Sequence, residues 1–190
     1  MISMIRIIFT LIFITSCGYV SFNQIRPSLE LALFGADDIN INQEYIDAKS
    51  YSFAKVKIGR TAVAILSLAS IEDEVFLWIS SNGIRIYTYH GKIIKTEGLN
   101  HDYEMINYSG FSKNPGNVLY DVMLYNPKAF IEQESKIYLS QSNIIEEIST
   151  LSFRWRYTNS YKYDQKGLVV YSKQKVHPNI PEIEIYFFYK

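Results

Sequence analysis

Cysteine is almost absent from this sequence, and neither sign of charge is in excess. The 190 residues include one cysteine, so no disulfide can form within the chain. Lysine and arginine together number 19, as do aspartate and glutamate, and the formal net charge is zero. A nucleic-acid-binding domain normally carries a basic surplus or stripe. We therefore expect no nucleic acid among the partners of this protein.

The motifs of the common hydrolase classes are missing as well. The G-x-S-x-G sequence that presents the nucleophile of many serine hydrolases does not occur. His90, His101 and His177 are isolated in turn-rich contexts, whereas zinc hydrolases carry paired histidines on a helix. No glycine loop of the phosphate-binding kind is present. The sequence therefore predicts no metal ion, no cofactor and no enzymatic activity.

One pair of carboxylates leaves an enzymatic alternative open. In the segment HDYE, residues 101–104, an extended backbone would place Asp102 and Glu104 on the same side. Glycosidases use two carboxyl groups roughly 5 to 9 Å apart as acid and base. Because neighbouring acids are also common on solvated sheet edges, we favour a structural role. A polysaccharide-modifying enzyme that uses Asp102 and Glu104, periplasmic if the chain is exported, is kept as the alternative.

A long apolar run is also lacking, and the run at the N-terminus is short. The segment MISMIRIIFTLIFITSCG has one basic residue, Arg6, then an apolar stretch over residues 7–14 and small residues after it. A spanning helix needs ~20 apolar residues, so this layout is typical of a secretory signal peptide rather than of a transmembrane anchor.

The single cysteine, Cys17, follows Ile14, Thr15 and Ser16 at the end of the apolar run. This order resembles the bacterial lipobox, and the alternative is a soluble exported protein. The resemblance implies a lipoprotein signal peptide over residues 1–16 and acyl chains on Cys17. Two or more acyl chains anchor a protein stably to a membrane. Gly18 in place of an aspartate implies sorting to the outer membrane.

After a lipidated tether over residues 17–24, residues 25–190 are expected to form a single β-rich periplasmic domain. Residues 27–35 read as a short helix that begins at Pro27 and ends at Gly35. Residues 61–70 are apolar at both alternating positions, as in a strand covered on both faces. Further strands are expected at residues 118–125, 135–141, 144–148, 151–157, 168–175 and 182–189. These short strands predict an all-β fold, a β-sandwich or partly open barrel of antiparallel strands.

Residues 75–96 have the pattern of a three-stranded meander. Strands over residues 75–79, 84–89 and 92–96 are separated by Ser81-Asn82-Gly83 and by His90-Gly91. An Asn-Gly pair favours a tight hairpin because both residues tolerate a positive φ. Alternation then predicts core positions at Leu77, Ile79, Ile84 and Ile86.

Two sets of aromatic and basic residues are candidates for contact with a glycan or a protein partner. Alternation places Arg85, Tyr87 and Tyr89 on one face of the second meander strand. In the expected strand over residues 151–157, Arg154 and Arg156 share the face opposite Trp155. Aromatic rings can stack on sugars, and arginine can hold an acidic sugar bidentately. Tyrosine and arginine are also ordinary residues on the outer face of a sheet.

The segment FLWISSNGIRIYTYHGKIIKTEGL, preceded by the covered strand AVAILSLAS, resembles the YjbF or GfcB family of group 4 capsule polysaccharide lipoproteins. In that family a Trp-containing strand, a glycine turn, an aromatic strand and a second glycine turn lead to a K-T-x-G-L ending. The resemblance implies an outer-membrane lipoprotein that faces the periplasm and is a non-enzymatic accessory factor in capsule or exopolysaccharide secretion. It also implies an outer-membrane β-barrel protein of the same system as partner, beside membrane lipid and polysaccharide.

Overall fold

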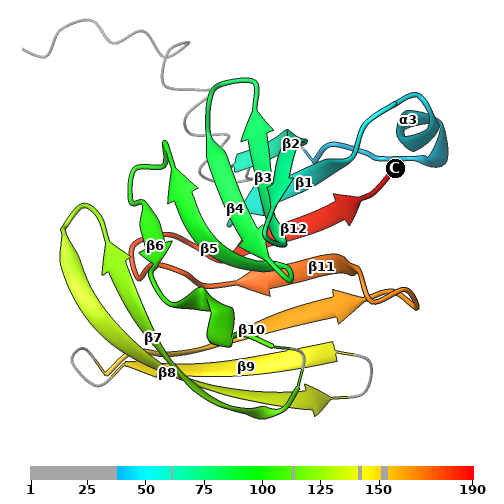
Figure 1. Cartoon of the computed structure of the whole chain (residues 1–190). Coiled ribbons are helices and arrows are strands. Elements are labelled where there is room, and N and C mark those ends of the chain that lie inside the picture. Colours follow the sequence, from blue (N-terminus) through cyan, green and yellow to red (C-terminus); the bar gives the residue numbers. More distant parts are fainter. Residues whose placement is uncertain (1–37, 61, 113, 141–142, 151–153) are drawn as a thin grey trace, which may run out of the picture. The chain divides into compact units, whose positions relative to one another are not determined.

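A computed structural model describes residues 38–190, apart from residues 61, 113, 141–142 and 151–153. The signal peptide, Cys17, the tether and the helix expected over residues 27–35 lie outside these residues. The described chain forms a short helix, α3 (Gln43–Asp47), a 3-10 turn, η1 (Tyr108–Gly110), and twelve strands (Figure 1). The strands are β1 (Phe53–Ile58), β2 (Ala62–Glu72), β3 (Val75–Ser80), β4 (Arg85–Tyr89), β5 (Lys92–Glu97), β6 (Tyr103–Met105), β7 (Gly116–Leu124), β8 (Ala129–Ser140), β9 (Asn143–Thr150), β10 (Arg156–Tyr163), β11 (Val169–Gln174) and β12 (Ile183–Phe188).

The twelve strands form a closed antiparallel barrel in which each strand pairs with its neighbours in sequence. The closure is made by β1 and β12, which pair from Phe53↔Phe188 to Ile58↔Ile183. The expected all-β antiparallel fold is confirmed, but the sandwich and the partly open barrel are wrong. The first strand pairs with the last, so the paired residues lie far apart in sequence. The alternation of apolar and polar residues along one strand cannot predict such a pairing.

The meander of β3, β4 and β5 is confirmed, although its two turns differ. In the first turn Gly83 has a φ of +86°, its N–H bonds the Ser80 carbonyl at 3.1 Å, and Asn82 does not adopt a positive φ. In the second turn His90 and Gly91 both do, with φ of +49° and +84°. The two-residue turn with both residues left-handed is therefore His90-Gly91 rather than Asn82-Gly83.

Strand β3 faces the core with the opposite set of residues from the one expected. Trp78 and Ser80 are buried, whereas Leu77 and Ile79 lie half-buried on the other face. Trp78 is 1% exposed, and its Nε1 donates to the Thr88 hydroxyl at 3.0 Å. In the segment FLWIS, both sets of alternating residues contain apolar side chains. The set with Trp78 faces the core because burying the large indole gains the most free energy. Ile86 is buried as expected.

The strand expected over residues 151–157 is found only at its end: residues 151–153 lie outside the described residues, Arg154 and Trp155 are not in a strand, and Arg156 and Tyr157 begin β10. The Thr150 N–H bonds the Trp155 carbonyl at 3.0 Å, and the Arg154 N–H bonds the Thr150 carbonyl at 3.1 Å. Arg154, with a φ of +54°, therefore lies in the turn that joins β9 to β10. Strand β10 begins at Arg156.

Candidate functional site

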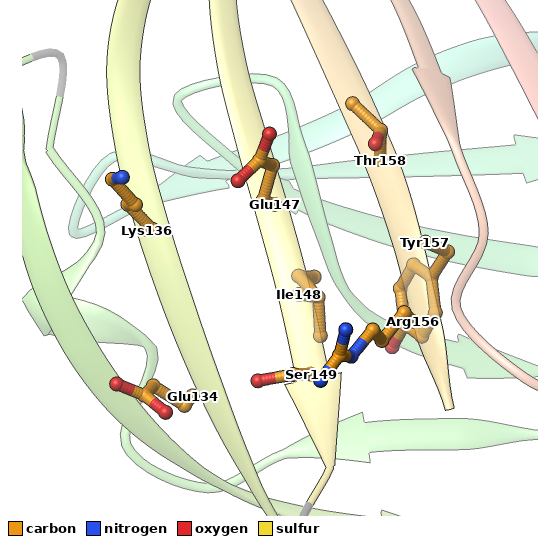
Figure 2. A pocket seen from close by; sticks show the side chains of 8 residues that line it. All are labelled: Glu134, Lys136, Glu147, Ile148, Ser149, Arg156, Tyr157 and Thr158. Carbon is orange, nitrogen blue, oxygen red and sulfur yellow. The ribbon is translucent and has the colours of Figure 1, made fainter. Parts of the chain in front are cut away.

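An open groove crosses the outer faces of β8, β9 and β10 (Figure 2). Its volume is about 430 Å³. Strand register arranges most of its side chains in two rows, Glu134–Ser149–Arg156 and Lys136–Glu147–Thr158. Ile148 and Tyr157 also belong to the lining, although Ile148 is buried and the Tyr157 hydroxyl contacts Gln133 inside the barrel. The groove is therefore a polar sheet surface that carries charges of both signs.

Three charged side chains of the groove are available to a ligand. Glu134, Lys136 and Arg156 are exposed, and none has an ion-pair partner within 4 Å among the residues described. Glu147 accepts a hydrogen bond from the Tyr138 hydroxyl at 3.0 Å. Figure 2 shows Arg156 extending from β10 toward Ser149 on β9, while Glu134 and Lys136 come from β8.

A second pocket of about 310 Å³ adjoins the groove and shares Arg156 and Tyr157 with it. Its other lining residues are Trp155, Lys175 and Pro178. The lining thus contains two cations and two aromatic residues, but no carboxylate. The Lys175 ammonium donates to the carbonyl of Ile180, which uses one of its three donors.

Arg156 is placed between the two hollows by the turn before it. The Trp155 N–H bonds the Thr150 hydroxyl at 3.2 Å, which fixes the end of β9 against the start of β10. Arg156 is then the first residue of β10, opposite Ser149. Arg154 lies in the turn and does not line either hollow. The structure therefore separates the two arginines that were expected to share a strand face.

The other candidate surface, on β4, faces outward as expected. Arg85 is exposed, and Tyr87 and Tyr89 are half-buried. Arg85 is paired with Glu97 at 3.1 Å, and Tyr89 packs on Tyr108 with ring centroids 5.2 Å apart. The hydrogen bond from Arg85 is the main reason that the pKa of Glu97 lies below its ordinary value.

Arg85 and Arg156 do not belong to one site. Five strands separate β4 from β10 in either direction around the barrel. Their outer faces therefore point to opposite sides, and the two candidate surfaces are distinct.

Asp102 and Glu104 have structural contacts. Asp102 accepts hydrogen bonds from the Thr96 hydroxyl at 3.1 Å and from the N–H groups of Gly98 and Leu99 at 3.1 and 3.0 Å. Glu104 pairs with Lys95 at 3.3 Å and accepts from the Tyr125 hydroxyl at 2.8 Å. Both carboxylates thus stabilise the β5–β6 turn and its neighbours, and neither lines the groove or the adjoining pocket.

A buried ion pair inside the barrel was not found from the sequence. Lys92 Nζ lies 2.5 and 2.6 Å from the two carboxylate oxygens of Glu146, and the side chains are 2% and 0% exposed. Glu146 also accepts from Ser135, Tyr161 and Asn159 at 2.7, 2.8 and 3.2 Å. Burial would raise the pKa of Glu146, but the Lys92 ammonium and these hydrogen bonds hold it below its ordinary value.

The sequence held a signal for one partner of this ion pair. Glu146 alternates in phase with Ile144 and Ile148, which marks it as an inward position of β9. The adjacent Glu147 has the opposite phase and lies in the groove. Lys92 directly follows the turn glycine Gly91, and no alternation of apolar residues around it indicates an inward position.

His101 and His177 lie together at one end of the barrel. Their rings stack with centroids 5.0 Å apart. His177 is 1% exposed, and its Nε2 has no hydrogen-bond partner among the described residues. Burial, and then the nearby His101 and Lys175, lower the pKa of His177 to about 4.

The described residues contain neither a metal-binding cluster nor a membrane-spanning helix. In that part of the chain no three His, Cys, Asp or Glu residues are grouped to hold a metal ion. Within the same residues, no helix has the length and the apolar composition that crossing a bilayer requires.

Comparison with known proteins identifies the family. Residues 26–116 and 135–188 match the model of the family described as group 4 capsule polysaccharide lipoprotein gfcB, YjbF. The uncharacterized lipoprotein GfcB of Escherichia coli (strain K12) is 26% identical over 99 residues, which cover 52% of this chain and 46% of that protein. The crystal structure of the hypothetical lipoprotein YmcC from Escherichia coli (K12) has a TM-score of 0.71 at 17% identity, and covers 90% of this chain and 96% of that one. The last likeness confirms the fold, and the family match confirms the resemblance noted in the meander: the chain belongs to the group 4 capsule polysaccharide lipoprotein family of GfcB and YjbF.

Proposed function

We propose that this protein is an outer-membrane lipoprotein that acts as a non-enzymatic accessory factor in the secretion or assembly of a capsule or exopolysaccharide. The observation that carries the proposal is the polar groove with its adjoining pocket, whose Glu134, Lys136 and Arg156 are exposed and have no ion-pair partner among the described residues. Such a surface suits the holding of a glycan or of a partner protein. Asp102 and Glu104, the candidate acid and base, are engaged in structural contacts instead.

The anchor in this proposal is the acylated Cys17, which fixes the barrel at the periplasmic face of the outer membrane. The membership in a lipoprotein family supports this assignment. Since two or more acyl chains bind a bilayer durably, the protein would stay at the membrane while its groove works in the aqueous phase.

The proposed protein partner is an outer-membrane β-barrel protein of the same secretion system. In the described barrel every strand has a neighbour on both sides, and β1 is closed by β12. A partner therefore cannot add a strand to an open sheet edge, which is a frequent mode of recognition. It would have to recognise side chains on the outer faces of the strands.

The anchor is tested by Cys17→Ala in cells that make the polysaccharide. We expect the variant to leave the outer-membrane fraction and polysaccharide output to fall, because the protein is no longer held where export takes place. Ser16→Ala serves as the matched control, since a small residue is kept before the cysteine. A Cys17→Ala protein that still fractionates with the outer membrane would contradict the anchor.

The enzymatic alternative is tested by replacing Asp102 and Glu104 with Asn and Gln. Under the accessory function, polysaccharide output and glycan structure stay as in the wild type once protein amounts are matched. Loss of output from a variant that is still folded and abundant would favour the enzyme instead.

A further inference from the structure

We infer that the groove and the adjoining pocket form one continuous site for a stretch of acidic polysaccharide, in which a sugar carboxylate binds Arg156. The inference rests on the proposed function, since it names the class of ligand that the accessory factor would hold. Four features of the surface support it: the continuity of the two hollows, their charge, their hydrogen-bonding groups and their aromatic wall.

Continuity follows from the shared lining. Arg156 and Tyr157 belong to both hollows, so a ligand can pass from one to the other over β10. The volumes are about 430 and 310 Å³, and pockets for small ligands span roughly 300 to 1,000 Å³. The combined site therefore extends from β8 across β9 and β10 to Lys175 and Pro178, and its two volumes both lie in the range of ligand pockets.

Charge selects an acid at the pocket end. Arg156 and Lys175 line the pocket, and its lining contains no carboxylate. Arg156 has no ion-pair partner among the described side chains, and Lys175 keeps two of its three donors after its bond to Ile180. The planar guanidinium holds a carboxylate through two parallel hydrogen bonds. A uronate ring in this pocket would supply the missing anion.

The groove end has groups that suit neutral sugar rings. Ser149 and Thr158 offer hydroxyls, and the carboxylates of Glu134 and Glu147 can accept hydrogen bonds from sugar hydroxyls. Lys136 is the one cation in the Glu147 row. Because the two glutamates would repel a polymer with an anion on every unit, the pattern favours a chain whose acidic sugars alternate with neutral ones.

Trp155 supplies the apolar wall of the pocket. It is half-buried against the core and lines the pocket beside Pro178. The C–H face of a sugar ring packs on such an aromatic surface. Trp78, the second tryptophan, is buried in the barrel, so a change in exposed tryptophan fluorescence would report on Trp155.

The test is a titration of the full-length protein, purified in a detergent without a sugar headgroup. Three uronate polymers serve as probes, hyaluronate, alginate and polygalacturonate, and dextran is the neutral control. Calorimetry and tryptophan fluorescence measure the affinity. We expect binding of hyaluronate, in which uronate and neutral sugars alternate, and weaker binding at high salt. Dextran is expected to bind at least tenfold more weakly.

The matched variants are Arg156→Gln and Arg85→Gln. Arg156→Gln should weaken hyaluronate binding about tenfold, because a charge-assisted bidentate contact is lost. Arg156→Lys should keep part of the affinity. Arg85→Gln removes the same charge on the opposite side of the barrel and should leave the affinity unchanged. Both positions are exposed, and equal urea midpoints will show that the variants are folded.

Several results would overturn the inference. These are no binding of any uronate polymer, equal binding of dextran and hyaluronate, or an Arg85→Gln loss as large as that of Arg156→Gln. The inference and the proposed function fail separately. Absence of uronate binding removes the site and leaves the accessory function standing, whereas unchanged polysaccharide output in a strain without this protein removes the accessory function even if hyaluronate binds.

Discussion

Lys92→Met is expected to destabilise the barrel far more than the loss of a surface lysine. Lys92 contacts both oxygens of Glu146 at 2.5 and 2.6 Å, and neither side chain reaches solvent. Removing one partner of a buried ion pair costs about 3–5 kcal/mol, because the other charge stays buried and unpaired. The hydrogen bonds that Glu146 keeps from Ser135, Tyr161 and Asn159 place the expected loss near the lower end, at about 3 kcal/mol.

Urea unfolding measures this loss. With an m-value of about 2 kcal/mol/M, a loss of about 3 kcal/mol lowers the midpoint by roughly 1.5 M. Lys173→Met is the matched control, since Lys173 pairs with Glu182 at 2.8 Å and the two side chains are 40% and 51% exposed. A pair in solvent contributes at most about 1 kcal/mol. The double variant Lys92→Met/Glu146→Gln should regain most of the loss, because it removes the unpaired charge and keeps hydrogen-bonding groups.

The pH dependence provides an independent check. Without Lys92, burial raises the pKa of Glu146 above that of the unfolded chain, so the folded variant binds a proton more readily. Stability gained by that proton is fully present below the unfolded pKa and is lost as the pH rises through the folded one. Lys92→Met should therefore lose less stability at pH 5 than at pH 8. A midpoint shift no larger than that of Lys173→Met, at both pH values, would refute the reasoning.

Two further predictions concern a turn and a histidine. Gly91→Ala should lower the free energy of unfolding by about 3 kcal/mol, since φ is +84° and the new Cβ would lie 2.5 Å from Cγ2 of Val169. Gly83→Ala, at φ +86° with open space around the new Cβ, should lower it by only about 1 kcal/mol. Urea unfolding measures both, and equal losses would exclude the contact with Val169. Because the folded pKa of His177 is depressed to about 4, the unfolded state binds more protons below pH 6.5, and stability falls as the pH drops. Wild-type protein should lose about 2 kcal/mol more than His177→Asn between pH 7 and pH 5, and parallel pH profiles would contradict this.

The sequence predicted the parts of the fold that local chemistry determines. Glycines at positions 83 and 91 mark turns that the structure contains, and alternation in residues 85–89 gave the correct outward face for Arg85. Alternation failed where both phases are apolar, as around Trp78. It also gives no strand signal where a polar residue occupies an inward position, as Asn159 does in β10, and no strand was expected over residues 158–163.

The candidate site was only partly accessible from the sequence. Arg156 was found, but its neighbours Lys136, Glu147 and Lys175 come from β8, β9 and the segment after β11. These residues meet through strand register and the curvature of the barrel, which are tertiary properties. Arg85, Arg154 and Arg156 were all chosen from the sequence because each lies near aromatic residues. The structure shows that Arg85 is paired with Glu97, that Arg154 lies in a turn and that Arg156 faces the groove.

The pairing of β1 with β12 has a consequence for the order in which the protein can fold. A chain emerges from the ribosome or a translocation pore with its N-terminal end first, so Phe53 is present long before Phe188, its partner in the closing ladder. Until the final strand arrives, β1 has an unpaired edge, and such edges recruit other chains into aggregates. The meander of neighbouring hairpins can form early from local contacts, while closure must wait for the last residues. Loss of the terminal strand alone would therefore leave an open sheet, in which β1 and β11 have unpaired edges that can bind other chains.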